Sequence, residues 1–411
     1  MTRDLFPAFA NPTRAAALQT LRGFTPRMGS RYAKGRNYDR GPGQHRDVSG
    51  LSPFLRRRLI SEPEVIAAAT GAHGPGAAEK FIQEVVWRSY FKGWLERRPQ
   101  VWRAYRDGLE RDLMALDHDR AQRRDVIRAE AGQTGLACFD AWAQELVETG
   151  YLHNHARMWF ASIWIFTLGL PWRLGADFFL RHLLDGDPAS NTLGWRWVAG
   201  LHTRGKPYAA QAWNIAQFTG QRFTPREADF AQVTHGLDHL EPDGLPPVQP
   251  LRTPVAPAPG LPTALLLTEE DCHPEAFDLS ALPLTACLRL HASHLRSPLP
   301  VSDAVARFEA GALADTANRL GMASDEMRAG VPTDLARWAQ RHGVRQIVTP
   351  YVPEGPLRDW LFDAAPALSA AGIPLCELRR PWDSAVWPLA TAGFFKVKKA
   401  IPHLLLTQNL M

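Results

Sequence analysis

TGYLHNHARMWFASIWIFTLGLPWRLGADFFLRHLLDGDPASNTLGWRWVAG, residues 149–200, is the stretch of this sequence that packing alone explains least well. Within it, the DGD at 185–187 places two carboxylates around a glycine bend, and Asn191, Trp195 and Trp197 follow within ten residues. A helix boundary accounts for the DGD by itself, since aspartate and glycine are common at turns and caps. That interpretation leaves HNHARM upstream and GWRW downstream unexplained, so the stretch indicates a functional site.

The stretch lies in a half of the chain that carries helical patterns almost throughout. In EKFIQEVVWRSYFKGWLERR (79–98), for example, apolar residues recur at three- and four-residue spacing. Ten of the 14 tryptophans fall in residues 1–226, a density that packed core side chains would explain for the most part. We therefore expect residues 1–226 to form a nearly all-α domain.

The pattern changes after residue 226. Residues 227–262 are rich in proline and show no sustained periodicity, which predicts a linker. Short apolar runs that fit buried strands then alternate with helical segments: strands at 263–271, 282–290, 345–350 and 373–380, and helices at 302–321, 333–343 and 357–372. Strand and helix alternating at this spacing predict a parallel sheet covered by helices, an α/β domain over 263–411.

Charge is distributed unevenly along the 411 residues. The formal net charge is +5, but residues 1–226 carry 32 Lys and Arg against 21 Asp and Glu, while the remainder carries 15 against 21. The helical half is therefore where a polyanion such as nucleic acid would bind. Charge alone leaves a solvated basic surface as an equally good explanation.

The composition also limits the class of protein. No run approaches the roughly 20 apolar residues of a membrane helix, and residues 1–25 lack the apolar core of a secretory signal, so we expect a cytoplasmic protein. The four cysteines have neither CxxC pairing nor nearby histidine spacing, which gives no indication of a metal or an iron–sulfur cluster. We expect Cys138, Cys272, Cys287 and Cys376 to be free and mostly buried.

Six motifs, in the family's order, resemble the FAD-binding domain of the photolyase/cryptochrome family. The family motifs TGWMHNRxRM, WRxGxxYF and DGDxAxNxGGWQW are similar to the opening stretch. VSGLSPFLRRRLIS (48–61) resembles TSRLSPYLxxGxIS, FIQEVVWRSYF (81–91) resembles FxxELxWREFY, and GQTGLACFDAWAQEL (132–146) resembles GxTGxPxxDAxMRQL. The resemblance covers roughly residues 25–223 and implies an all-α FAD-binding domain.

The resemblance assigns flavin contacts by position. It implies that Tyr32, Ser49, Leu51 and Ser52 hold the FAD pyrophosphate, that Arg157 and Asp185 form an ion pair over the flavin, and that Asp185, Gly186 and Asp187 contact its ring or ribose edge. Asn191 would face flavin N5. A neutral amide there accepts the N5 hydrogen bond without placing a negative charge beside FADH⁻.

A second set of residues is implied for the lesion. Glu84 would hydrogen-bond the pyrimidine edge with Asn154 beside it, and Trp87 and Trp197 would offer flat faces to a flipped-out dimer. Met158 would pack under the dimer, and Arg88 would contact backbone phosphates. Each tryptophan taken alone is more simply a core residue, but the whole set predicts a site.

Two of these positions select the lesion. Family members that repair (6–4) photoproducts carry histidines at the positions of Asn154 and Met158, because their mechanism needs proton transfer. Here His153 and His155 flank Asn154 without occupying the matching places. The resemblance therefore favours cyclobutane pyrimidine dimers.

The chain departs from the family at several places. Val48 stands where threonine is usual and Gly50 where arginine is usual, so two flavin or phosphate contacts are in doubt. Trp195 and Trp172 match the first two tryptophans of the electron relay, but spacing puts the third near Asp119. Candidates to replace the third are Trp142, Trp159 and Trp164.

The order of the domains also departs from the family. Family members begin with the α/β domain, whereas here the α/β pattern comes last, and GFFKVKKAIPHLL (393–405) is similar to the segment that normally closes that domain. This order predicts a circular permutation with the proline-rich linker as the new joint. Whether an antenna chromophore is bound is left open.

Three functions follow from the resemblance. The first is a monomeric, blue-light-driven photolyase, a deoxyribodipyrimidine lyase that repairs dimers in DNA by electron transfer from FADH⁻. The second is a cryptochrome-like photoreceptor, which would not need Glu84, Trp87, Asn154, Met158 and Trp197. The third is a flavoprotein with a structural or redox role.

Overall fold

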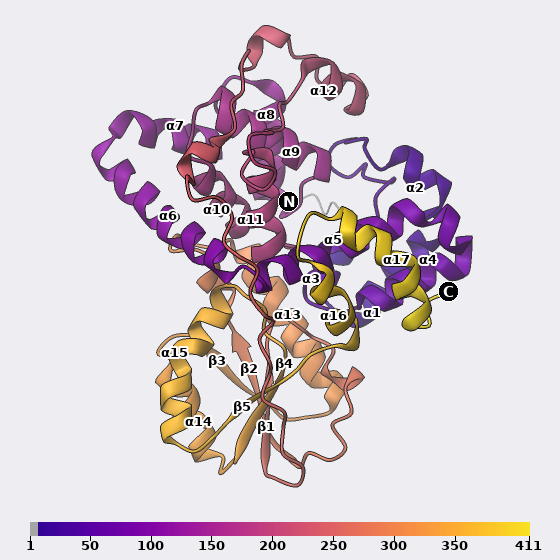
Figure 1. The fold of residues 1–411 in the computed structure, drawn as a ribbon, viewed down its shortest axis with the longest axis vertical. Helices are drawn as coiled ribbons and strands as arrows, with labels where there is room; N and C mark the ends of the chain where they lie inside the picture. The colour runs from indigo at the N-terminus through magenta and orange to yellow at the C-terminus, as the bar shows by residue number, and fades with distance from the viewer. Residues whose placement is uncertain (1–6) are drawn as a thin grey trace.

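The computed structural model describes residues 7–411, and the first half of this range is almost entirely helical (Figure 1). Its α-helices are α1 Arg14–Phe24, α2 Ser30–Gly35, α3 Ser52–Arg56, α4 Glu62–Ala77, α5 Glu79–Glu96, α6 Pro99–His118, α7 Arg120–Glu130, α8 Ala137–Thr149, α9 Asn154–Ser162, α10 Trp172–His182, α11 Pro188–Val198 and α12 Ala212–Phe218. A π-helical turn, Ile163–Thr167, continues α9. The predicted all-α domain is confirmed.

A five-stranded sheet follows, in the order β3-β2-β1-β4-β5, with every pair parallel. The strands are β1 Thr263–Leu267, β2 Leu284–His291, β3 Asp325–Arg328, β4 Gln346–Pro350 and β5 Leu375–Leu378. Between them lie α13 Asp303–Leu320, α14 Thr333–Arg341 and α15 Pro356–Ala370. The predicted parallel α/β fold is confirmed, although the sequence patterns did not indicate β3.

Both faces of this sheet are covered. In β1, Leu265 and Leu267 share a core with α13 and the helical half, whereas Ala264 and Leu266 share one with α14 and α15. Every position of the strand is buried, and all but Thr263 are apolar, as expected for a parallel sheet covered on both sides. One of its two cores is continuous with the core of the helical half.

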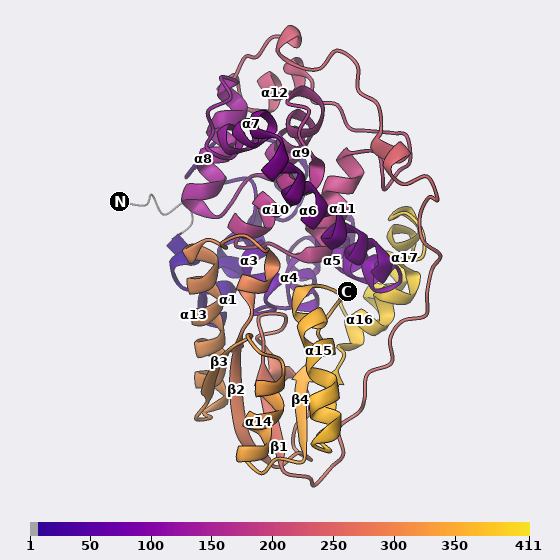
Figure 2. The same cartoon turned by 90° about the vertical axis from the view of Figure 1, so that its left-hand side faces the viewer.

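The proline-rich segment 227–262 runs along the outside of the molecule from the region of α12 to β1 (Figure 2). Apart from two short 3₁₀ turns, Glu227–Asp229 and Leu237–Leu240, it has no regular secondary structure. Its role as a linker between two domains stays a prediction.

The last part of the chain returns to the helical half. The helices α16 Pro381–Val386 and α17 Phe395–Thr407 pack beside α5, near the middle of the molecule and away from α14 at its lower end (Figure 1). A short 3₁₀ turn, Trp387–Leu389, joins them and also packs on α5. The segment after β5 thus belongs spatially to the helical half, although the sequence pattern grouped it with the α/β domain.

Two further observations bear on the class of protein. All four cysteines are buried and free, as predicted. Within residues 7–411, no helix has the length and apolar character needed to cross a bilayer. The cytoplasmic location stays a prediction, and residues 1–6 lie outside the described part.

Candidate functional site

A cavity of about 510 Å³ in the helical half brings the predicted site residues together. Its volume falls within the usual range for ligand pockets, roughly 300–1,000 Å³. The predicted flavin residues in its wall are Tyr32, Ser49, Leu51, Ser52, Arg157, Asp185, Gly186, Asp187 and Asn191. The predicted lesion residues in its wall are Glu84, Trp87, Arg88, Asn154, Met158 and Trp197, and Trp195 joins them.

The DGD segment, residues 185–187, immediately precedes α11. Asp187 is the N-cap of this helix, and its Oδ2 accepts a hydrogen bond of 2.9 Å from the backbone N–H of Ser190. Pro188 occupies the first helical position, where its missing N–H costs nothing. This start fixes the helix that carries Asn191, Trp195 and Trp197 along the cavity.

Asp185 forms the predicted ion pair with Arg157. Arg157 Nη2 donates to Asp185 Oδ2 at 3.0 Å, and Arg157 Nε donates to the carbonyl oxygen of Leu152 at 2.8 Å. The pKa of Asp185 is lowered: burial raises it, but the charge and hydrogen bond of Arg157 and the hydroxyl of Ser52 lower it further. Asp185 is therefore an ionised, buried carboxylate in the cavity wall.

The amide of Asn191 has a fixed orientation. Its Nδ2 donates to the carbonyl oxygen of Ala176 at 2.8 Å inside the helical core. This bond turns Oδ1 away from α10, and Asn191 lines the cavity. An acceptor at this position is the group that the hydrogen on flavin N5 would require.

The loop before α3 forms another part of the wall. Ser49 Oγ accepts a hydrogen bond of 3.3 Å from the N–H of Leu51, and Gly50 between them has φ of +64°. An arginine at this position, as the resemblance predicts, would be strained in this left-handed conformation. The loop therefore offers hydroxyls and backbone groups to a ligand. At Gly50 it makes a turn where the family usually has an arginine side chain.

The donor set of the cavity fits FAD. Arg88 Nε and Nη2, Ser190 Oγ and Trp195 Nε1 are buried polar atoms without a hydrogen-bond partner among the described residues, and all belong to residues that line the cavity. Such atoms are rare unless a ligand or water satisfies them. A Cβ added to Gly194 would meet no atom within 4 Å, so this glycine leaves the wall open. Cationic and hydroxyl groups suit a pyrophosphate, and the aromatic walls suit an isoalloxazine ring.

Among the predicted lesion residues, Glu84 is held by a residue that the sequence did not indicate. Arg36 Nη1 donates to Glu84 Oε1 at 2.7 Å. Burial raises the pKa of Glu84, and the charge of Arg36 opposes this shift. Glu84 therefore lies in the wall with one oxygen engaged and the other available for a ligand.

The two predicted lesion tryptophans are each backed by another ring. Trp87 stacks on Phe394 with 3.8 Å between ring centroids and 16° between planes. Trp197 stacks on Tyr208 at 5.4 Å and 29°. Both indoles are partly exposed and line the cavity, so they present flat surfaces at its mouth.

Asn154 and Met158 are adjacent on α9, with 4.0 Å between Asn154 Nδ2 and Met158 Sδ. The neighbouring histidines bond backbone carbonyls outside the cavity wall: His153 Nε2 to Arg36 O at 3.1 Å and His155 Nδ1 to Asn37 O at 2.8 Å. Burial lowers the pKa of both, that of His153 to about 3. These imidazoles are therefore neutral and turned toward the protein.

The relay tryptophans differ in their surroundings. Trp195 lines the cavity and makes an edge-to-face contact with Trp164 at 6.3 Å. Trp172 is buried behind the wall, where its ring neighbour is Tyr105 at 5.8 Å, and Tyr105 continues to Trp102 at 5.3 Å. Trp142 and Trp159 stack on each other at 5.4 Å. Asp119 is an exposed N-cap at the start of α7.

Two cations below the cavity floor were missed by the sequence analysis. Lys92 Nζ lies 2.8 Å from Asp187 Oδ1, and Arg56 Nε donates to the carbonyl oxygen of Gly186 at 2.9 Å. The sequence does carry a signal for Lys92, because it follows Arg88 by four residues on α5. Two cations at this spacing lie on the same face of the helix, so Lys92 could have been predicted to lie near the site. Nothing in the spacing of Arg56 pointed to the DGD segment.

Comparison with known proteins agrees with this geometry. Residues 81–229 match the family model described as the FAD binding domain of DNA photolyase. The deoxyribodipyrimidine photo-lyase of Streptomyces griseus is 36% identical over 169 residues, covering 40% of this chain and 35% of that protein. The enzyme of the same name from a strain of Thermus thermophilus is 35% identical over 198 residues, covering 48% of this chain and 45% of that protein.

Among solved structures, a bacterial class III photolyase from Agrobacterium tumefaciens is 28% identical, covers 51% of this chain and 43% of that chain, and has a TM-score of 0.42. This chain thus spans less than half the length of the relatives described here. Residues 81–229 are thus similar to the FAD binding domain of DNA photolyase, and the predicted resemblance to the photolyase/cryptochrome family is confirmed for this part of the chain.

Proposed function

We propose that this protein is a light-driven, FAD-dependent photolyase that repairs cyclobutane pyrimidine dimers in DNA. The observation that carries the proposal is the single cavity in which the flavin candidates Asp185 and Asn191 and the lesion candidates Glu84, Trp87 and Trp197 share one wall. Direct electron transfer between a cofactor and a substrate requires them to be neighbours, and a shared cavity provides this. Enzymes that act on a base within a duplex flip it into such a pocket.

The residues at the flavin end have separate roles in the proposal. Arg157 and Asp185 orient the cofactor, the hydroxyls of Ser49 and Ser52 bind its phosphates, and Asn191 accepts the hydrogen of N5. When bound and reduced, FAD supplies the photoexcited electron that splits the cyclobutane ring and that is recovered afterwards.

The residues at the lesion end bind the flipped dimer. Trp87 and Trp197 stack on its two rings, and base-on-aromatic stacking contributes about 1–3 kcal/mol per base. Glu84 and Asn154 hydrogen-bond its polar edge, while Met158 packs against it. Asn154 and Met158 occupy the two positions at which (6–4) enzymes carry histidines, and both line the cavity. His153 and His155 bond backbone carbonyls outside its wall, and the imidazole that does line the cavity, that of His202, stands at neither of those positions, which supports cyclobutane dimers over (6–4) photoproducts.

We also propose that the chain is a circular permutation of the family arrangement. The family-type helical domain comes first, the exposed segment 227–262 leads away from it, and the parallel α/β fold follows. The return of α16 and α17 to α5 supports this order, since residues 381–411 then lie beside the domain from which the chain started. An exposed, irregular segment is where a rearranged joint is best tolerated.

The test is an anaerobic repair assay. Purified protein is loaded with FAD, reduced, and mixed with single- or double-stranded oligonucleotides that contain a cyclobutane thymine dimer. The fraction of dimers restored to thymines is measured after exposure to blue light and after the same time in darkness. Repair in the light only, and its loss in Glu84→Ala with FAD still bound, is expected. A reduced, FAD-loaded protein that leaves both substrates unrepaired in the light contradicts the proposal, and light-dependent association of the protein without repair would favour a photoreceptor.

A further inference from the structure

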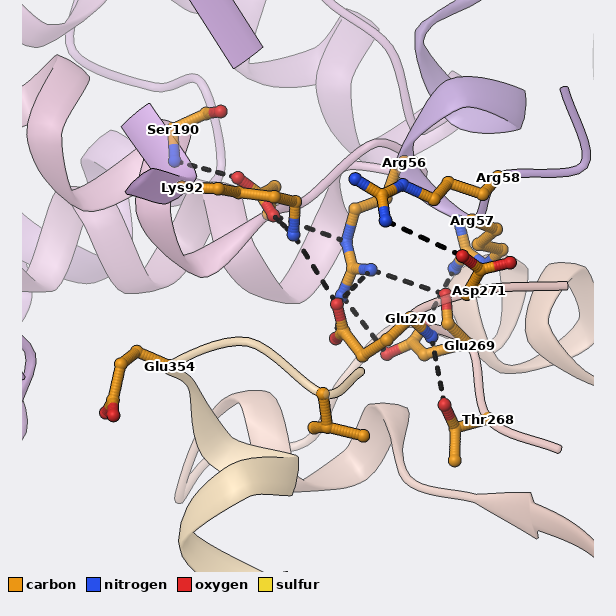
Figure 3. Close-up of polar contacts among 12 residues, drawn as sticks. Arg56, Arg57, Arg58, Lys92, Ser190, Thr268, Glu269, Glu270, Asp271 and Glu354 are labelled. Atoms are coloured by element: carbon orange, nitrogen blue, oxygen red, sulfur yellow. Dashed lines mark hydrogen bonds and ion pairs between the residues drawn. The ribbon is translucent and has the colours of Figure 1, made fainter. Parts of the chain in front are cut away.

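The end of β1 inserts three consecutive carboxylates between the two halves of the molecule. Glu269, Glu270 and Asp271 follow this strand and meet Arg56, Arg57 and Arg58 at the end of α3 (Figure 3). All six side chains are buried. Charges of this kind are stable in a protein interior only when each is paired, so the two halves cannot separate here without exposing unbalanced charge.

Within this cluster, Glu270 has the contacts that reach the cavity. Its carboxylate accepts two hydrogen bonds from Arg56, at 2.9 Å from Nη1 and 2.7 Å from Nη2. Lys92 Nζ lies 3.5 Å from the same carboxylate. Glu270 therefore holds the two cations that lie beneath the cavity floor.

Those two cations in turn hold the DGD segment. Arg56 Nε donates to Gly186 O at 2.9 Å, and Lys92 Nζ lies 2.8 Å from Asp187 Oδ1. Asp187 caps α11 through its other oxygen, Oδ2, which accepts the hydrogen bond of 2.9 Å from the backbone N–H of Ser190. A continuous chain of contacts thus connects a residue of the α/β half to the helix that carries Asn191.

The four charged groups form a neutral set. Glu270 and Asp187 carry two negative charges, and Arg56 and Lys92 carry two positive ones, with exposures of 1% for Arg56 and 5% for Lys92. The charges of Lys92 and Arg56 hold the pKa of Asp187 far below its usual range despite complete burial. Water screens buried charges weakly, so removing one member leaves its opposite acting on the cavity above.

We infer that Glu270 is a positioning residue of the flavin site, supplied by the α/β half: it balances Arg56 and Lys92 and thereby sets the position of Asp187 and the electrostatic potential at the cofactor. This rests on the proposed binding of FAD in the cavity. It gives the α/β half a role in the flavin chemistry that is independent of any antenna chromophore.

The midpoint potential of the bound flavin tests this inference, because FADH⁻ carries more negative charge than oxidised FAD. Glu270→Gln leaves one excess positive charge and should raise the potential relative to the wild-type protein. Lys92→Met leaves one excess negative charge and should lower it. The double variant Glu270→Gln/Lys92→Met is neutral again, and its potential should return toward that of the wild type.

A matched control separates this effect from a general loosening of the two halves. Asp359 on α15 accepts hydrogen bonds from Trp102 Nε1 at 2.8 Å and Arg106 Nη1 at 2.9 Å on α6, and none of these residues lines the cavity. Asp359→Asn makes the same carboxylate-to-amide change between the same two halves and should leave the potential unchanged.

Each outcome decides the matter. Shifts of opposite sign in Glu270→Gln and Lys92→Met support the inference. An unmoved potential in either single variant, or equal shifts in Glu270→Gln and Asp359→Asn, overturns it. If Glu270→Gln does not fold, Lys92→Met and the neutral double variant still give the comparison. Wild-type protein that carries no FAD overturns the proposed function, and the inference with it.

Discussion

The indole of Trp87 on α5 lies flat against the ring of Phe394, 3.8 Å between centroids, so a residue from the C-terminal segment holds a wall of the predicted lesion pocket. Phe394 is buried and lies outside the cavity lining, whereas Trp87 is part of it. Phe394 therefore packs on the face of the indole that points away from the cavity. Its segment is also fastened to α5, because Tyr90 Oη donates to Ala392 O at 3.0 Å.

Replacing Phe394 should weaken substrate binding without loss of FAD. In Phe394→Ala the Trp87 indole loses its support, and we expect affinity for dimer-containing DNA to fall about tenfold, or about 1.4 kcal/mol. Fluorescence anisotropy with a labelled oligonucleotide measures this. Phe395→Ala is the control, because that neighbouring ring is 65% exposed and should change little. Equal affinities of Phe394→Ala and the wild type would show that Trp87 needs no support.

Asn191 gives a prediction about the flavin. In Asn191→Asp the group facing N5 becomes a carboxylate, which repels FADH⁻ and cannot donate to Ala176 O as the amide does. The midpoint potential of bound FAD should therefore fall. Asn191→Ser, a neutral replacement, should change it less. Identical potentials in the aspartate and serine variants would place N5 elsewhere in the cavity.

The relay provides a third prediction. Of the three substitute tryptophans, Trp164 has a ring contact with Trp195, so we expect Trp164→Phe to slow photoreduction of oxidised FAD about tenfold, an increase of about 1.4 kcal/mol in the barrier. Trp142→Phe serves as the control, because Trp142 stacks on Trp159. Flavin bleaching under continuous blue light with an external thiol reports the rate. If photoreduction is slower in Trp142→Phe than in Trp164→Phe, the electron passes through the Trp142–Trp159 pair and not through Trp164.

Stability should depend on pH through Glu354. Burial and the nearby carboxylates of Glu96 and Asp359 raise its pKa from 4.5 to about 7. The folded protein then binds a proton more tightly than the unfolded chain, so the stability due to this group is present below pH 4.5 and is lost as pH rises to about 7. Glu354→Gln should remove this part of the decline.

Thermal unfolding at several pH values measures the effect of Glu354→Gln. The difference in unfolding temperature between variant and wild type should grow in favour of the variant as pH rises. Glu148→Gln is the control, because Glu148 is exposed on α8. Parallel pH profiles for wild type and Glu354→Gln would mean that Glu354 titrates normally.

The sequence predicted those parts of the structure that local patterns determine. Apolar periodicity indicated the helices, and short apolar runs indicated four of the five strands. Asp325–Arg328 escaped because DEMR is polar and mostly exposed: it is an edge strand held by pairing with β2. The packing of residues 381–411 on α5 could not be predicted, since nothing in the pattern of this segment indicates that contact.

In the candidate site, the residues that belong to the family motifs were predicted to lie together. The charged residues that contact them from other segments were not predicted. Motif positions brought Asp185, Asn191 and Glu84 to one cavity. Arg36 and Glu270 come from segments distant in sequence, and only the tertiary packing brings them near. Arg58 likewise has a partner that the sequence did not indicate. It occupies the glycine position of the family motif with φ of +49°, and it donates two hydrogen bonds, both 2.7 Å, to Asp383.

If flavin and dimer occupy one cavity in contact with each other, the excited-state lifetime of the reduced flavin reports that contact directly. Anaerobic, FAD-loaded and reduced protein is measured alone, with undamaged oligonucleotide and with dimer-containing oligonucleotide. Electron transfer to a neighbouring dimer should shorten the lifetime with the damaged strand only. An unchanged lifetime at saturating damaged DNA would contradict the account, because it would place the dimer out of reach of the flavin.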